Sequence, residues 1–145
     1  MIEYTGQTRA DYSFFHPVSL RVSDVDINDH LNQSVYYEFF DTAVLRFLEQ
    51  CTSAFPIDDG ITTFCVENGC RYRREVKFAD QVEVALRVSH IGTTSMRFDL
   101  AIFTEGHQEP NALAYFVLVF ASKQTRRPAP IPASLRNVAG RDGDG

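Results

Sequence analysis

One stretch, from Asn32 to Gln50, limits what this chain can fold into more than any other, because it alone has a long helical periodicity. Its apolar residues recur at the spacings of a single wide helical face. They are Val35, Tyr36, Phe39, Phe40, Ala43, Val44, Phe47 and Leu48. Asn32 or Ser34 can cap the helix start by accepting a bond from a backbone N–H. A helix that is apolar over so much of its circumference needs other structure wrapped around it.

Most of the remaining sequence alternates between apolar and polar residues, which is typical of half-buried β-strands. The expected strands are residues 18–23, 64–73, 82–89, 96–102 and 112–121. The last of these is apolar at every position, so it is expected to be covered on both faces. The first is expected to run directly into the Asp-rich turn before the helix. Turns or loops are expected at 55–60, 91–94 and 106–111, and a bulge or bend at Asn68-Gly69.

One strand, one enclosed helix and four further strands predict an α+β fold, in which an antiparallel sheet of five or six strands wraps around one long central helix. This layout resembles the hotdog fold. We expect a single domain over residues 1–125 and a flexible tail over residues 126–145, which are rich in Pro, Ala, Arg and Gly. Because an exposed apolar strand edge favours pairing with a second chain, a homodimer or homotetramer is expected.

The composition excludes several classes of function. With 145 residues, 44% of them hydrophobic, and a net charge of −5, the chain can build a core but has no surplus of Lys and Arg for nucleic acid. Its basic doublets, Arg73-Arg74 and Arg126-Arg127, are too short for a groove that follows a nucleic-acid backbone. They are interpreted as solvated strand ends, and either could also meet one or two phosphates of a small ligand. No apolar run could span a membrane, and the N-terminus lacks a signal-peptide pattern. A cytoplasmic protein with no membrane partner is therefore expected.

The cysteines and histidines do not predict a metal site. Cys51, Cys65 and Cys70 lack metal-type pairing and suit a reducing compartment. Cys65 and Cys70 lie in an alternating strand, so both are expected to pack in the core. The histidines at positions 16, 90 and 107 are scattered along the chain.

The polar residues that could carry chemistry cluster just before the predicted helix. Asp26, Asn28 and His30 occur at alternate positions there. Taken alone, such residues are typical of turns and helix caps. Their spacing, the strand before them, the aromatic helix and the four later strands together favour a catalytic site instead.

The stretch Arg21–Phe40 resembles the opening of the 4-hydroxybenzoyl-CoA thioesterase-like family, in which a strand leads into Asp-x-Asp, a Gly-His-x-Asn-Asn loop and a Tyr-containing helix start. Asp26 to His30 is also similar to the Asp-x-Asn-x-His motif of plant acyl-carrier-protein thioesterases. With the strand order, the resemblance covers about residues 15–122. Asp29 stands where the bacterial family usually has Gly, and Gln33 where it usually has a second Asn. With these departures, the resemblance still indicates the reaction but does not identify the substrate.

The resemblance implies an acyl-CoA or acyl-carrier-protein thioesterase with four catalytic residues. Asp26 would attack the thioester or activate water, and the backbone N–H of Gln33 in the first helical turn would stabilise the developing oxyanion. Asn28 would hold Asp26 or the water by its amide group. His30 would position the carbonyl or assist proton transfer. Coenzyme A would be part of the substrate, and no cofactor is expected.

Further residues are expected around these. The predicted substrate-binding residues are Tyr36 and Phe40 for the acyl group, and Arg73, Thr94 and Ser95, together with Arg71, for the nucleotide end of coenzyme A. Asp24 is expected to make structural hydrogen bonds, and Glu67 is a reserve nucleophile.

Two other functions remain open at this point. A hotdog enoyl-CoA hydratase or dehydratase would carry Asp-x-Asn-Pro-x-His, whereas here His30 follows Asp26 by four positions and no Pro intervenes. A non-catalytic acyl-binding module would keep an aromatic pocket around Tyr36, Phe39 and Phe40 but would not need Asp26. The presence of Asp, Asn and His together favours the hydrolase.

Overall fold

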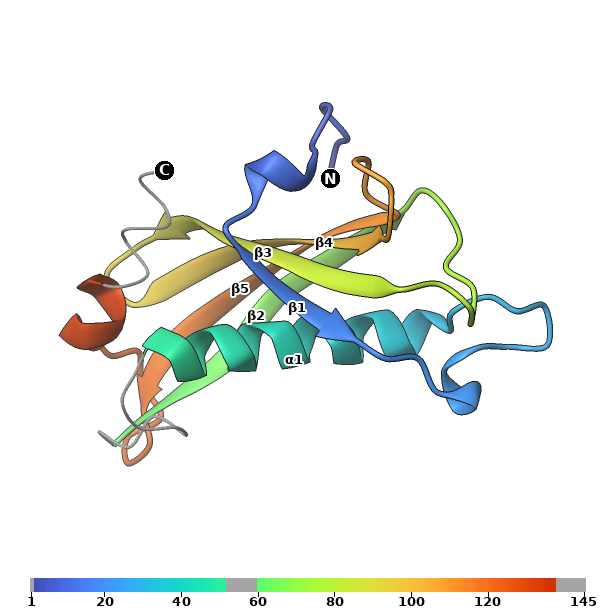
Figure 1. The fold of residues 1–145 in the computed structure, drawn as a ribbon. Coiled ribbons are helices and arrows are strands. Elements are labelled where there is room, and N and C mark those ends of the chain that lie inside the picture. Colours follow the sequence, from blue (N-terminus) through green and yellow to red (C-terminus); the bar gives the residue numbers. More distant parts are fainter. Residues whose placement is uncertain (1, 52–59, 138–145) are drawn as a thin grey trace.

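The computed structural model describes residues 2–51 and 60–137, in which five strands form one antiparallel sheet with a long helix on one face (Figure 1). The elements are β1 (Phe14–Val18), α1 (Gln33–Cys51), β2 (Ile61–Tyr72), β3 (Val82–Ile91), β4 (Ser95–Thr104) and β5 (Ala112–Ser122). Their order across the sheet is β1-β3-β4-β5-β2. The predicted α+β hotdog fold is confirmed, with five strands.

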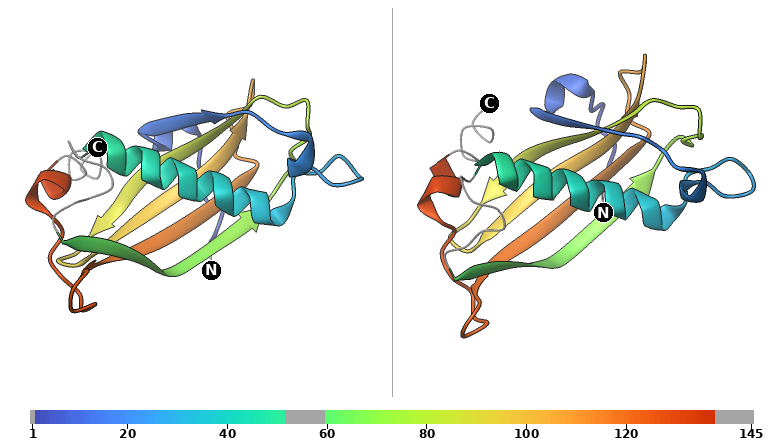
Figure 2. Two further views of the ribbon diagram at one scale, coloured as in Figure 1. Left: turned by 90° about the horizontal axis from the view of Figure 1, so that it is seen from below. Right: turned by 60° about the horizontal axis from the view of Figure 1, so that its bottom comes forward.

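The helix lies across the concave face of the sheet (Figure 2) and forms the main core with it. Phe47 packs edge-to-face on Phe98 of β4 at a centroid distance of 5.9 Å, and Phe40 packs in the same way on Phe116 of β5 at 6.2 Å. The buried residues of the helix are Val35, Tyr36, Phe39, Phe40, Ala43, Val44, Phe47, Leu48 and Cys51. The predicted apolar face of the helix is therefore the face that the sheet covers.

The N-terminal strap, residues 2–13, lies on the opposite face of the sheet from α1 (Figure 1). It includes a short 3-10 turn at Arg9–Asp11, and Tyr12 packs edge-to-face on Phe103 at 5.8 Å in a second, smaller core. Arg9 fastens the strap to the sheet, because its guanidinium contacts the carboxylate of Glu83 at 2.8 Å. Both faces of the sheet are thus partly covered. On β5, Leu113 reaches the second core, whereas Tyr115 stays half-buried.

The first predicted strand is wrong in its bounds. The strand ends at Val18, and Val22–Asp24 forms a 3-10 turn instead of leading straight into the loop. Asp24 closes this turn, because its carboxylate accepts bonds from the backbone N–H and the guanidinium of Arg21. Burial alone would raise the pKa of Asp24, but the bonds and charge of Arg21 lower it below its usual value. The expected structural role of Asp24 agrees with these contacts.

The predicted irregularity in β2 also lies elsewhere. The register against β5 shifts between Cys65 and Glu67, not at Asn68-Gly69. Residues 64–68 around the shift are all exposed, so the expected core position of Cys65 is wrong, while Cys70 is half-buried against the core. Close packing explains the glycine at position 69, because a Cβ added there would lie 2.8 Å from the ring of Tyr115.

The flexible tail predicted from residue 126 does not begin there. Ile131 and Leu135 are buried in the main core, and the guanidinium of Arg136 donates to the carbonyl oxygens of Gly92 and Thr93. The sequence did not predict this core contact, because the two apolar side chains lie four positions apart in a Pro- and Ala-rich segment. Residues 138–145 of the predicted tail and 55–59 of the predicted loop lie outside the described residues.

Candidate active site

A tight turn before α1 presents the polar cluster. The N–H of Asp26 donates to the carbonyl oxygen of His30 at 2.9 Å, and Val25 pairs with Leu31 as an isolated bridge. Asp29 has a left-handed backbone, with φ of 59°, a conformation that Gly adopts freely and Asp tolerates better than most residues. Its carboxylate accepts the N–H of Phe78 at 3.0 Å, which ties the turn to the segment after β2. The side chain of Asp29 thus supplies a contact that Gly would lack.

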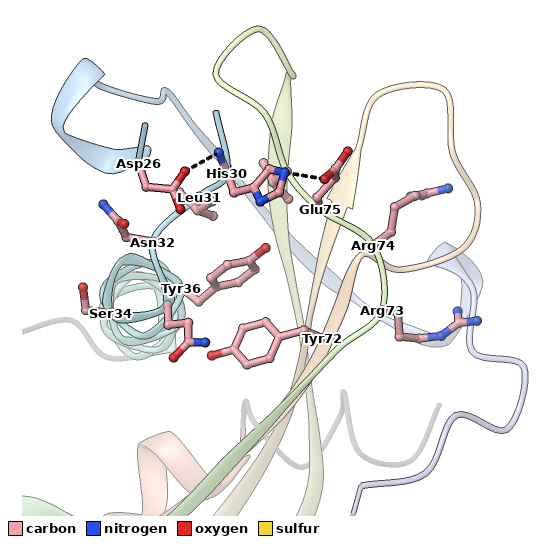
Figure 3. A pocket seen from close by; sticks show the side chains of 12 residues that line it. Asp26, His30, Leu31, Asn32, Ser34, Tyr36, Tyr72, Arg73, Arg74 and Glu75 are labelled. Atoms are coloured by element: carbon pink, nitrogen blue, oxygen red, sulfur yellow. Dashed lines mark hydrogen bonds and ion pairs between the residues drawn. The ribbon is translucent and has the colours of Figure 1, made fainter. Parts of the chain in front are cut away.

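Asp26 is held by the backbone of its own turn. One carboxylate oxygen accepts the N–H of Asn28 at 2.8 Å. The same oxygen accepts the N–H of His30 at 3.0 Å (Figure 3). These bonds, that of His30 first, lower the pKa of Asp26 below its usual value. The carboxylate is therefore ionised near neutral pH, and it is exposed to solvent. Asn28 makes this contact through its backbone N–H, not through the amide group that the sequence suggested.

His30 is paired with a residue that the sequence did not indicate. Its Nε2 lies 2.5 Å from a carboxylate oxygen of Glu75, and both side chains are about half exposed. The other carboxylate oxygen of Glu75 lies 3.6 Å from the ammonium group of Lys77. Glu75 follows the end of β2 without any local motif, so only the tertiary fold reveals its place. Glu67, the reserve nucleophile, is exposed on β2 and does not line the same cleft.

Asn111 anchors the segment that carries Glu75. Its carbonyl oxygen accepts the N–H groups of Arg73 and Arg74 at 2.8 and 3.0 Å, and its side-chain amide donates to the carbonyl oxygen of Glu75 at 3.2 Å. Asn111 is 1% exposed, and the hydroxyl of Thr104 donates to its amide oxygen. A buried side chain on the chain segment before β5 therefore fixes the partner of His30.

We expect Asn111→Ala to lower the free energy of unfolding by about 1–3 kcal/mol, because the buried Thr104 hydroxyl and Glu75 carbonyl lose their partner. Urea unfolding measures this change. Asn68→Ala, at an exposed position of β2, serves as the control and should unfold like the wild type. Equal stability of the Asn111→Ala variant and the wild type would contradict the anchoring role.

The start of α1 offers unpaired donors beside Asp26. The carbonyl oxygen of Asn32 accepts the N–H of Val35 at 3.0 Å, and the N–H groups of Gln33 and Ser34 have no acceptor among the described residues. Free N–H groups and the positive end of the helix dipole favour an anion or a developing negative charge. The N–H of Asn32 donates to the carbonyl oxygen of Asp24, which fixes the helix start relative to the turn.

These groups share an open cleft of about 710 Å³. Its lining residues are Asp26, His30, Leu31, Asn32, Gln33, Ser34, Tyr36, Tyr72, Arg73, Arg74, Glu75 and Val76. Tyr36 and Tyr72 form one wall, packed edge-to-face with their centroids 4.9 Å apart (Figure 3). Burial raises the pKa of Tyr36 to about 12, so its hydroxyl stays protonated at neutral pH. An anionic carboxylate, an imidazole and free N–H donors thus face one solvent-accessible space.

The structure brings only some of the predicted site residues to this cleft. The predicted residues that line it are Asp26, His30, Gln33, Tyr36 and Arg73. Asn28 does not line the cleft, but its backbone N–H donates to the carboxylate of Asp26, which does.

Three predicted substrate-binding residues lie elsewhere. Phe40 is fully buried in the core against Phe116, because the apolar face of the helix that it belongs to is the covered one. Thr94 and Ser95 lie at the other end of the sheet: Ser95 pairs with Val119, whereas Tyr72 at the cleft pairs with Ala112. The β3–β4 turn and the helix start are at opposite ends of the fold, which the sequence did not show.

Two findings limit the kind of site. In residues 2–51 and 60–137, no three His, Cys, Asp or Glu side chains are grouped so that they could hold a metal ion. In the same part of the chain, no helix has the length and apolar character needed to cross a membrane.

The family model of the thioesterase-like superfamily matches residues 20–138, which contain the cleft, α1 and the strands β2 to β5. The chain belongs to the thioesterase-like superfamily. The resemblance inferred from Arg21–Phe40 is thereby confirmed at the level of this superfamily.

Other proteins resemble this superfamily member over most of its length. The PA5185 protein of Pseudomonas aeruginosa strain PAO1 has 35% sequence identity and a TM-score of 0.88, over 94% of this chain and 95% of its own. A thioesterase of Thermus thermophilus, solved with coenzyme A and Zn, has 23% identity and a TM-score of 0.76, over 90% and 94%, and shares the fold. YsmA of Bacillus subtilis (strain 168), an uncharacterised protein, is 24% identical over 118 residues, 81% of this chain and 78% of YsmA.

Proposed function

We propose that this protein hydrolyses an acyl thioester of coenzyme A or of acyl carrier protein to a free acid and a thiol. The observation that carries the proposal is the position of an ionised, exposed Asp26 in the same cleft as the free N–H groups of the α1 start. Thioester cleavage needs such a carboxylate beside the carbonyl carbon and donors aimed at the carbonyl oxygen.

Asp26 can act in two ways. As a nucleophile, its oxygen bonds to the carbonyl carbon while the C–S bond breaks, and water then hydrolyses the resulting anhydride to the acid. As a general base, it takes a proton from water while the water oxygen bonds to the same carbon, and the tetrahedral intermediate then expels the thiolate. In both cases negative charge gathers on the carbonyl oxygen, where the N–H of Gln33 stabilises it.

His30 and Glu75 supply the proton balance. A thiolate leaves in either course, and His30 lines the cleft where it departs. The carboxylate of Glu75 contacts Nε2 and so orients the imidazole. The proton that the attacking water gives up balances the thiolate in either course, and His30 can relay it to the sulfur. Asn28 contributes its backbone N–H to Asp26.

We expect Glu75→Gln to lower kcat roughly tenfold to 100-fold, because the imidazole loses the carboxylate that orients it for proton transfer. Initial rates of thiol release measure the effect. Glu67→Gln removes a carboxylate on β2 outside the cleft and should keep the wild-type rate. A loss at Glu67→Gln with none at Glu75→Gln would overturn these assignments.

Coenzyme A as the carrier is supported by the Thermus thermophilus thioesterase, which was solved with coenzyme A. A homodimer or homotetramer is supported by β2, an edge strand that exposes Phe64 and Val66. The net charge of −5 disfavours nucleic acid as a partner. We propose a cytoplasmic enzyme that needs no cofactor or metal beyond its substrate.

A panel of thioesters tests the proposed function. Aromatic and short- to long-chain acyl-CoA, and the matching acyl-carrier-protein thioesters, are incubated with the protein and a thiol reagent. We expect at least one of them to release thiol well above the buffer rate. Binding without cleavage across the whole panel would favour a non-catalytic acyl-binding module and would sink the hydrolase proposal.

A further inference from the structure

A second groove opens on the other side of the β2 end. It has a volume of about 540 Å³ and is lined by Glu3, Tyr4, Arg71, Tyr72 and Arg73. Tyr72 and Arg73 also line the catalytic cleft. The two spaces therefore meet at the end of β2, and in Figure 3 Arg73 points away from Asp26 and His30.

Arg73 is held in the second groove by the N-terminal strap. Its guanidinium carbon lies 3.5 Å from the centroid of the Tyr4 ring, a close cation–π contact. Among the described residues, the Arg73 side chain forms no hydrogen bond or ion pair. The ring of Tyr4 covers one face of the guanidinium, so the N–H donors along its edge remain available to a planar or tetrahedral anion.

Arg71 lies on the same side of β2, two positions before Arg73. One of its guanidinium nitrogens donates to the carbonyl oxygen of Ile2 at 3.0 Å, so the strap also fixes this side chain. The groove therefore contains two cationic groups against the single carboxylate of Glu3. Its residual charge is positive, on a chain whose net charge is −5.

We propose that this groove binds a phosphate group of a phosphopantetheine-type thiol carrier, with Arg73 as the main donor, Arg71 as the second cation and Tyr4 as the residue that positions Arg73. The inference rests on the proposed function, because the carrier is the thiol part of the thioester whose carbonyl lies at Asp26. The strap thereby becomes part of the substrate site, although it lies on the face of the sheet opposite α1.

Calorimetric titration of the full chain tests the proposal without requiring turnover. The probes are coenzyme A, 4′-phosphopantetheine and pantetheine, which differ in their phosphate groups. We expect Arg73→Gln to weaken coenzyme A binding at least about tenfold, since charge-assisted bonds to phosphate are lost. Tyr4→Ala should weaken it less, Tyr4→Phe should restore it, and pantetheine should bind all variants alike.

Arg97→Gln is the matched control, because Arg97 also stacks on a tyrosine, Tyr115, at 4.4 Å but lies outside both grooves that meet at β2. It should bind coenzyme A like the wild type. Thermal melting of each variant verifies that it is folded.

The outcomes separate the sources of the phosphate. An effect of Arg73→Gln on both phosphorylated probes assigns the groove to the phosphate of the pantetheine arm, which acyl carrier protein also bears. An effect on coenzyme A alone assigns it to the nucleotide. Wild-type coenzyme A binding by folded Arg73→Gln and Tyr4→Ala overturns the proposal. Asp26→Asn, which tests the hydrolase, should bind coenzyme A normally, so the two proposals fail separately.

Discussion

Asp26→Asn is expected to lower kcat for thioester cleavage by roughly 10³-fold, because the amide can neither attack the carbonyl carbon nor accept a proton from water. The amide oxygen can still accept the N–H groups of Asn28 and His30, so the turn should keep its shape. Initial rates of thiol release, with the best substrate of the panel, measure the effect.

Asp29→Asn makes the same chemical change three positions later and serves as the control. Asn tolerates the left-handed backbone of residue 29 and can still accept the N–H of Phe78. This variant should cleave at close to the wild-type rate. If both variants kept full activity, the carboxylate that does the chemistry would have to be sought outside this turn.

The second large effect is expected from Gln33→Pro. Residue 33 is the first residue of α1, where Pro fits the helix and removes only an N–H that has no intrahelical partner. The change deletes the proposed oxyanion donor, so kcat should fall about 10²–10³-fold. The Michaelis constant should change much less, because the donor acts on charge that develops in the transition state.

Gln33→Ala is the matched variant, because it removes the exposed side chain but keeps the backbone N–H. It should retain near wild-type kcat. Circular dichroism checks that the proline variant keeps α1. Equal losses in the two variants would assign the role to the side chain and contradict the backbone mechanism.

The fold could be predicted from the sequence wherever periodicity and burial agree. The apolar face of residues 32–50 could be satisfied only by an enclosing sheet, and the alternation of 82–89 and 96–102 identified β3 and β4. Prediction failed where one side-chain contact decides the backbone. Asp24 closes a turn on Arg21 instead of extending a strand. In β2 the pairing with β5 shifts between Cys65 and Glu67, and residues 64–68 are all exposed, so the apolar–polar alternation did not predict which side chains are buried.

Some residues of the candidate site could likewise be predicted from the sequence, and others could not. Asp26, His30 and Gln33 follow one another along the chain, so their spacing was enough to place them together. Glu75 and Tyr4 reach the site only through tertiary contacts, to His30 and Arg73 respectively, and no local pattern marks either of them. Phe40 was expected in the substrate pocket but is fully buried in the core, because an aromatic residue on the covered face of a helix serves the core as readily as a pocket.

The central claim is that Asp26 and the start of α1 hydrolyse a thioester in this cleft. Its most direct test measures free acid by mass spectrometry and thiol by a colorimetric reagent in the same reaction, for the wild type and for Asp26→Asn. The prediction is equal amounts of acid and thiol from the wild type, and almost none of either from the variant. Thiol released without acid, or acid formed equally well by Asp26→Asn, would contradict the claim.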